Sequence, residues 1–308
     1  MSELIAVCCH FNPCHYKKRV INYATFRKGI ERAGVHLITV EATINSEEPE
    51  LSLYDNVLHF EVKHVMWYKE QLLEKGIQYA IERFKAPYVM WIDADAVIEG
   101  AEWNKVIIKS LQKHKIIQGF NIAISLHSDR TIKKYCSVET IRNGLTLGRG
   151  APGGVWAARS DFFDTHNLYK YAIVGGGDAV FCFSMCFDVE NDIEKFSQLL
   201  EIQNRSINLW STSFKQHCLE WIQQTHIASD DVGFACQKAI FLEHGPSLPR
   251  WGPSRLEIMQ KFNPYRDVRV SKNGFLEWTN LEYEGEVYDY FKNRNEDNEG
   301  LSCQNTVP

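Results

Sequence analysis

The sequence lacks the long apolar run that a membrane-spanning helix requires. No stretch of about 18 apolar residues occurs in the chain. The first residues, 1–7, lead directly into an apolar segment, without the basic stretch and long hydrophobic region of a signal peptide. These absences argue against a membrane span. They lead us to expect a cytoplasmic protein, bacterial or viral in a host cell.

Concentrated charge and regularly spaced cysteine are also missing. The formal net charge is −5 and no run of five like charges appears, which disfavours nucleic acid as a partner because duplex-binding proteins usually carry a basic patch. The nine cysteines are scattered, without the spacing of a disulfide framework or of paired zinc ligands. Zinc at the cysteine- and histidine-rich segment 8–15 is a disfavoured alternative, since strand residues would alternate between two faces. We expect reduced thiols.

What is present is the composition of a globular protein. Of the 308 residues, 44% are hydrophobic and 24% are charged. This length allows one large α/β domain or two small ones, with a full core that needs no disulfide or metal. Neither an internal repeat nor a clean linker is visible.

Strand-like and helix-like patterns alternate along the first half of the chain. An uninterrupted apolar segment, Tyr88 to Ile92, is bounded by Pro87 and Asp93 and is typical of a central parallel strand. Residues 126–152 are polar and predict a long loop. Beyond Pro246 the hydrophobic residues show little of the periodicity that predicts a helix or a strand. The predicted strands are 4–11, 36–40, 57–62, 88–92, 116–124 and 153–158, and the predicted helices are 20–33, 65–84, 103–113 and, with interruptions, 178–224.

The strongest chemical signal is a pair of carboxylates, Asp93 and Asp95, directly after the buried strand. In open α/β sheets ligands bind at the carboxyl ends of the strands. Oxygen ligands suit Mg²⁺ and Mn²⁺, and such sites combine one or two carboxylates with substrate phosphates. An Asp-x-Asp pair also occurs by chance, and acidic residues cap helices. The preceding strand favours a metal site, since a carboxylate pair near a core is costly unless paired or metal-bound.

The order of motifs resembles the GT-A glycosyltransferases, nearest to family-2-like and galactosyltransferase-like members. Before the Asp-x-Asp pair stands a helix start, Trp67–Glu70. After it come a glycine-rich segment, Gly153–Arg159, then Gly175–Asp178, and a late His244–Gly245. The resemblance covers residues 3–250. It implies a GT-A fold, which is a Rossmann-like mixed, mostly parallel sheet between helices. The catalytic domain would span 1–250, an extension over 251–295 would pack on it, and 296–308 would be a disordered tail.

The resemblance also implies roles for matching residues. Asp93, Asp95 and His244 would bind Mn²⁺ or Mg²⁺, with Asp93 also near the diphosphate. Residues bordering the nucleotide-sugar donor, expected to be a UDP-sugar, would be Phe11, Asn12, Glu41, Lys69, Gly153 and Gly154. The alternatives without a functional role are that His244 is a surface loop histidine and that Lys69 is a solvated helix residue.

Asp178 resembles the general base of inverting members of that family, which removes the proton of the acceptor hydroxyl. Three glycines before it would let the backbone approach a ligand. Asp178 also precedes an apolar run, so it can serve as a helix N-cap, and the two roles are compatible. Trp156, Trp251 and Trp278 are weaker candidates for stacking on sugar rings. Residues 250–253 are a candidate lid over the donor.

Three other readings remain open. Residues 93–97 fit the Asp-x-Asp-x-Val motif of haloacid-dehalogenase phosphatases, but two strand-helix passages precede them, and Asp230-Asp231 lacks that family's Gly-Asp start. A sugar nucleotidyltransferase would have a Gly-rich loop after the first strand, where Phe11–Tyr16 has no glycine. A lectin-like module would not need the three aspartates together.

The predicted reaction is transfer of a hexose from a nucleotide-diphosphate sugar to an acceptor hydroxyl, with inversion. A glycan is the expected acceptor. A hydroxylated protein side chain or a hydroxymethylated DNA base remains an alternative.

Overall fold

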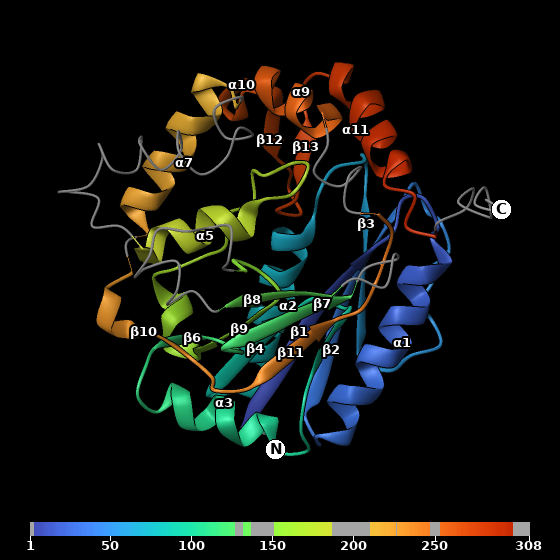
Figure 1. Cartoon of the computed structure of the whole chain (residues 1–308). Helices are drawn as coiled ribbons and strands as arrows, with labels where there is room; N and C mark the ends of the chain where they lie inside the picture. Colours follow the sequence, from blue (N-terminus) through green and yellow to red (C-terminus); the bar gives the residue numbers. More distant parts are fainter. Residues whose placement is uncertain are drawn as a thin grey trace, which may run out of the picture.

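The chain forms a mixed α/β fold in which helices cover both faces of a twisted sheet (Figure 1). The computed structural model describes residues 3–126, 132–136, 151–186, 210–225, 227–246 and 253–297. Among these residues, no helix combines the length and apolar character needed to cross a bilayer.

The main sheet has seven strands in the order β10-β6-β9-β4-β1-β2-β3. Every neighbouring pair is parallel except the two pairs that contain β9. This confirms the predicted α/β class with a mixed, mostly parallel sheet. The strands are β1 (Leu4–Phe11), β2 (His36–Ile44), β3 (Val57–Val62), β4 (Tyr88–Ile92), β6 (Ile116–Gln118), β9 (Val155–Arg159) and β10 (Val232–Phe234).

Two smaller sheets complete the β structure. One has the order β5-β11-β7-β8 and the other pairs β12 with β13. Their strands are β5 (Ala96–Ile98), β7 (Ile122–Leu126), β8 (Ile132–Cys136), β11 (Lys238–Phe241), β12 (Val268–Val270) and β13 (Leu276–Trp278).

The helices lie on both sides of the main sheet (Figure 1). The α-helices are α1 (Lys17–Arg32), α2 (Lys69–Phe84), α3 (Trp103–Leu111), α5 (Gly177–Cys186), α7 (Thr212–Gln224), α9 (Pro253–Lys261), α10 (Pro264–Asp267) and α11 (Glu282–Asn293), and the 3₁₀ turns are η1 (Ser160–Asp164) and η2 (Ser229–Asp231).

Alternation along β1 divides the core into two layers. Ile5 and Val7 belong to an apolar cluster with α2, α5 and the C-terminal helices. Leu4, Ala6 and Cys8 face the opposite side and pack with α1 and α3. A strand buried on both faces must be apolar at every position, which explains the uninterrupted hydrophobic run.

Two sequence expectations differ from the structure around the sheet. The predicted single strand over 116–124 is two strands, β6 and β7, in different sheets. The break falls at Gly119, where a Cβ would lie 2.3 Å from Val155 Cγ1, so close packing on β9 sets the turn. The helix expected from Val65 begins at Lys69. The loop expected over 126–152 contains β8, and residues 127–131 and 137–150 lie outside the described part.

The C-terminal part is more regular than the sequence indicated. Residues 253–297 contain three helices and a β-hairpin where few periods were visible. Phe262, Leu276 and Val287 are buried in the same apolar cluster as Val7 of β1. The elements α10, β12 and β13, of three or four residues each, are too short to show a periodic pattern, so tertiary packing determines them.

Candidate active site

The candidate site lies where β4 ends, at the carboxyl edge of the parallel strands. Asp93 follows Ile92 directly, and its backbone N–H donates to Gly154 O at 2.8 Å. The Asp95 carbonyl accepts from Leu242 N at 2.8 Å. The turn that carries both carboxylates is therefore fixed between the start of β9 and the segment after β11, as expected for a ligand site in an open α/β sheet.

Lys69 connects two of the predicted site residues. Its Nζ lies 2.6 Å from Asp93 Oδ1 and 2.7 Å from Asp178 Oδ2. Burial alone would lower the pKa of this lysine, but the charges of Asp178 and Asp93 raise it well above its usual value. Lys69 is therefore a fixed cation between the strand end and the start of α5, not a solvated helix residue.

The carboxyls around Lys69 differ in their affinity for protons. Burial raises the pKa of Asp93 to about 6, and Lys69 offsets part of this effect. Glu70 is buried at the first turn of α2, and burial together with the charge of Asp178 raises its pKa to about 8. Its Oε1 has no hydrogen-bond partner among the residues that the structure describes. Burial and the nearby charge thus favour the neutral acid form of Glu70 at neutral pH.

The glycines predicted to border the ligand, Gly153 and Gly154, leave room for neighbouring side chains to pack closely on the backbone. A Cβ on Gly153 would lie 2.5 Å from Asp178 Oδ2, and one on Gly154 would lie 2.1 Å from the Phe241 ring. Gly154 also has a φ of +95°, which side-chain-bearing residues rarely adopt. These two positions let the Asp178 carboxylate and the Phe241 ring approach the backbone that holds Asp93.

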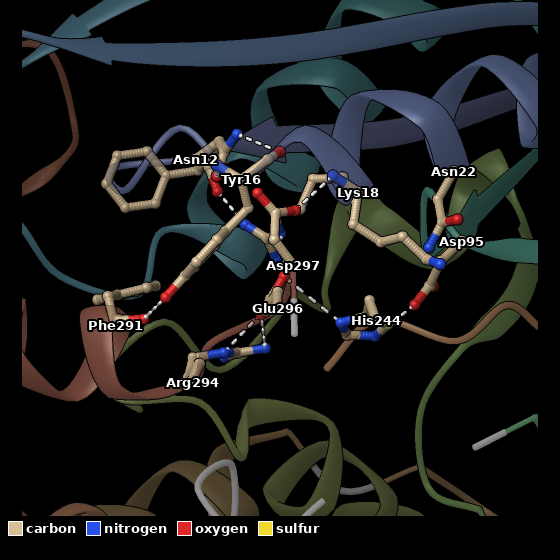
Figure 2. A network of polar contacts seen from close by, with 12 residues as sticks. Asn12, Tyr16, Lys18, Asn22, Asp95, His244, Phe291, Arg294, Glu296 and Asp297 are labelled. Atoms are coloured by element: carbon tan, nitrogen blue, oxygen red, sulfur yellow. Dashed lines mark hydrogen bonds and ion pairs between the residues drawn. The ribbon is translucent and has the colours of Figure 1, made fainter. Parts of the chain in front are cut away.

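Asp95 and His244 form the second half of the site (Figure 2). His244 Nε2 lies 2.6 Å from Asp95 Oδ2, and both side chains are largely buried. His244 comes from the segment after β11, which the hydrogen bond from Leu242 N holds against the Asp95 turn. The structure thus brings together two predicted metal ligands separated by 149 positions in sequence.

The donor set fits a divalent ion at Asp95 and His244. One carboxylate oxygen and one imidazole nitrogen already converge there, and a mixed nitrogen and oxygen set suits Mn²⁺ better than Mg²⁺. Asp93 does not complete a tight group of three ligands with them, because its carboxylate is directed to Lys69. Within the described residues, the group of three converging ligands is another one, His10, Glu41 and Glu50.

The other predicted donor contacts, Phe11, Asn12 and Glu41, line an open hollow at the ends of β1 and β2. The Glu41 carboxylate is buried there and accepts from Glu50 N at 2.8 Å, with His59 Nδ1 at 3.1 Å. The hydrogen bond from Glu50 N thus helps to hold the loop that forms one wall of the hollow. The hollow is lined by His10, Phe11, Asn12, Pro13, His15, Glu41, Ala42, Thr43, Ile44, Glu47, Glu48 and Glu50.

Phe11 and Asn12 have mainly structural contacts. The Phe11 ring packs edge-on against Tyr68 and Phe291. Asn12 Oδ1 accepts from Tyr16 N at 3.0 Å, and its Nδ2 donates to Glu50 Oε2 at 2.9 Å. Both residues shape the hollow, while Glu50 presents the carboxylate that sequence reasoning missed. Its only signal was the acidic run Glu47–Glu50.

The aromatic candidates are not exposed platforms. Trp156 and Trp278 are 1% and 4% exposed. Trp156 stacks on Trp91, and Trp278 stacks on Tyr283. Stacking of these two on sugars was therefore a wrong expectation, because both rings are core. Trp251 and most of the candidate lid, residues 250–252 of 250–253, lie outside the described part.

Two residues expected in a disordered tail pack against the rest of the chain. Glu296 is 1% exposed and lies 2.8 Å from Arg19 through its Oε2. Asp297 accepts hydrogen bonds from the start of α1. Residues 298–308 lie outside the described part. Nothing in the sequence distinguishes Glu296 from a solvated tail residue, since its partners are far away along the chain.

No family model and no curated protein matches the chain. Solved structures do show similarity. One is the catalytic domain of Drosophila β1,4-galactosyltransferase 7 with xylobiose, at 13% identity and a TM-score of 0.36, covering 59% of this chain and 60% of that one. Another is Staphylococcus aureus TarS with UDP-GlcNAc, at 10% identity and a TM-score of 0.38, covering 59% and 52%.

A third is glucosyl-3-phosphoglycerate synthase from Mycobacterium tuberculosis with Mg²⁺ and UDP, at 11% identity and a TM-score of 0.35, covering 76% of this chain and 69% of that one. The chain matches less than two thirds of the length of the first two proteins. At such identities and TM-scores the function has to be argued from the residues of the site.

Proposed function

We propose that the chain is a metal-dependent glycosyltransferase that moves a hexose from a nucleotide-diphosphate sugar, a UDP-sugar, to an acceptor hydroxyl with inversion. The observation that carries this proposal is the convergence at one strand end. Lys69 bridges Asp93 and Asp178 there, and the same turn presents Asp95 to His244. A carboxylate, a cation and a metal-ligand pair at the edge of a parallel sheet suit a diphosphate donor.

Asp95 and His244 would hold the ion, with Asp93 beside it. When bound there, the ion would supply positive charge that stabilises the nucleoside diphosphate as a leaving group. Lys69 holds the Asp93 carboxylate in place through its 2.6 Å contact and adds positive charge where a diphosphate would lie. The open hollow at the ends of β1 and β2, with Glu50 and Asn12 on its wall, is where the nucleoside would lie.

Asp178 is the candidate base. In the transfer, the acceptor oxygen forms a bond to the anomeric carbon, the bond from that carbon to the diphosphate breaks, and the acceptor proton passes to the Asp178 carboxylate. One displacement of this kind inverts the configuration. Asp178 is suited to this role because Lys69 orients it and Gly153 leaves it room beside the strand turn. The acceptor we propose is a glycan.

The phosphatase alternative is not favoured by the positions of its residues. Asp231 lies just before β10, which is parallel to β6 and ends at the same sheet edge as β4. It therefore sits at the amino edge of the sheet, paired with Lys115 at 3.0 Å, while Asp93 lies at the carboxyl edge. The acidic pair expected at 230–231 cannot share a metal with Asp93.

A donor screen tests the proposal. A panel of UDP-, GDP- and other nucleotide sugars is added with Mn²⁺, and thermal unfolding and then nucleotide release are measured. A ligand that binds only the folded chain raises its melting temperature. We expect one UDP-sugar to stabilise wild type and the control Asp161→Asn, and not Asp95→Asn. Asp161 is exposed at the far sheet edge.

Stabilisation by no nucleotide sugar, together with hydrolysis of a generic phosphomonoester, would overturn the proposal.

A further inference from the structure

The chain returns to the metal-ligand pair after α11. Residues Arg294–Asp297, called the strap below, lie across the start of α1 and beside His244 (Figure 2). The strap packs directly on Gly245, where a Cβ would lie 2.8 Å from Glu296 Cα and 3.0 Å from Arg294 O. Only a glycine next to His244 leaves this space.

The strap buries a carboxylate behind the histidine. Glu296 is 1% exposed, with Arg294 Nε 2.6 Å from its Oε1 and Arg19 Nε 2.8 Å from its Oε2. A buried charge needs close partners, and two guanidinium groups supply them here. They also fix the position of the carboxylate, since they approach it from α1 and from the strap.

The same carboxylate faces the ring nitrogen of His244 that is turned away from Asp95. His244 Nε2 lies 2.6 Å from Asp95, and its Nδ1 lies 3.5 Å from Glu296 Oε2. Nδ1 is buried and makes no well-formed hydrogen bond within the described part of the chain. The ring is thus placed between two carboxylates, one for each nitrogen.

We propose that Glu296 is a positioning residue that accepts the Nδ1 proton of His244 and so presents the Nε2 lone pair to a divalent ion. A carboxylate behind a histidine ligand fixes the tautomer and ring orientation and makes the imidazole a better ligand. This inference rests on the proposed function, because it assumes that Asp95 and His244 bind the ion.

The strap has a second anchor that is independent of His244. The Asp297 carboxylate accepts from Lys17 N at 3.0 Å and from Lys18 N at 2.7 Å, and so caps the first turn of α1. Asp297 therefore offers a matched control: it shares the strap, the charge and the contact with α1, but not the contact with His244.

Mn²⁺ alone is the probe, added to the full chain, with bound ion measured from the loss of the EPR signal of free Mn²⁺. Glu296→Gln is expected to weaken Mn²⁺ binding by about 10- to 100-fold. Asp297→Asn is expected to lower the melting temperature and leave Mn²⁺ binding unchanged. A role of the strap in stability only would move the melting temperature of both variants and Mn²⁺ binding of neither.

The outcomes separate the two proposals. If wild type does not bind Mn²⁺, or Asp95→Asn binds it equally well, the metal site of the proposed function fails. If Asp95→Asn loses Mn²⁺ while Glu296→Gln binds like wild type, only the role of Glu296 is overturned.

A measurement on wild type covers the case in which Glu296→Gln does not fold. ¹⁵N NMR of the histidines with Zn²⁺ in place of Mn²⁺, with the His244 signals assigned from their loss in His244→Gln, reports the tautomer. A protonated Nδ1 and a metal-bound Nε2 support the proposal, and the reverse overturns it.

Discussion

The ammonium group of Lys69 lies 2.7 Å from the carboxylate of Asp178 and 2.6 Å from the carboxylate of Asp93. The candidate base, Asp178, and Asp93 therefore share one ion-pair partner, a lysine at the start of α2. A base must have a fixed direction to meet the acceptor proton. Lys69 provides that direction, and it also keeps two nearby carboxylates from repelling each other.

Replacing Lys69 by methionine should lower kcat for sugar transfer, because Asp93 and Asp178 would lose their common partner. The matched control is Lys75→Met on the same helix, whose ammonium lies 5.8 Å from the Phe275 ring, away from the aspartates. Steady-state kinetics of both variants check this. Normal kcat in Lys69→Met would show that the bridge has no part in transfer.

Replacing Asp178 by asparagine should lower kcat by about 10²- to 10⁴-fold, the usual contribution of a positioned general base. Donor binding should remain, since the metal ligands are unchanged, so the thermal shift produced by donor and Mn²⁺ should match that of wild type. A loss of the thermal shift with kcat unchanged would assign Asp178 to donor binding instead.

Glu70 should make the chain less stable as the pH rises. Its folded-state pKa of about 8 lies above the ordinary value of 4.5, so the folded chain holds a proton that the unfolded chain has released. The stabilising effect is complete below the unfolded pKa and is lost as the pH rises through the folded one. Asp93, raised to about 6, acts in the same direction at lower pH.

Melting temperatures measured from about pH 5 to about pH 9 check this linkage. Glu70→Gln mimics the neutral acid, so its melting temperature should fall less over this range than that of wild type. Glu82→Gln, exposed on the same helix, should behave like wild type. Parallel curves for wild type and Glu70→Gln would contradict the raised pKa.

Gly154→Ala should destabilise the chain for two separable reasons, backbone strain and overlap with Phe241. Gly100 has a similar φ, +99° against +95°, but open space around its Cβ, so Gly100→Ala measures the backbone cost alone. That cost is about 1–3 kcal/mol. Denaturant unfolding should show a clearly larger loss for Gly154→Ala. Equal losses would show that Phe241 moves aside freely.

The sequence was a good guide wherever a short local pattern carried the information. The strand limits Leu4–Phe11, Val57–Val62 and Tyr88–Ile92 were predicted at both ends. For the first and last of these the reason is that a strand buried on both faces is almost entirely apolar, and polar or proline residues bound it. The position of Asp93 and Asp95 at the carboxyl edge followed directly from the last of these.

The sequence was a poor guide where packing set the structure. Trp156 and Trp278 are core because neighbouring rings cover them, which no local pattern reports. The break at Gly119 depends on the side chain of Val155, 36 positions away. The pair of Asp95 with His244 was expected from resemblance, but its contact distance was not.

By itself, the sequence determined the α/β class, the central strands and the acidic residues that follow them, since these depend on the period and length of apolar segments. Only the tertiary structure decided which charges meet. Lys69 reaches Asp178 across 109 positions, and Glu296 reaches Arg19 across 277. Ion pairs of this kind depend on how whole helices and strands pack against one another. The free energy of that packing comes from contacts throughout the core, so no single segment of the sequence reports it.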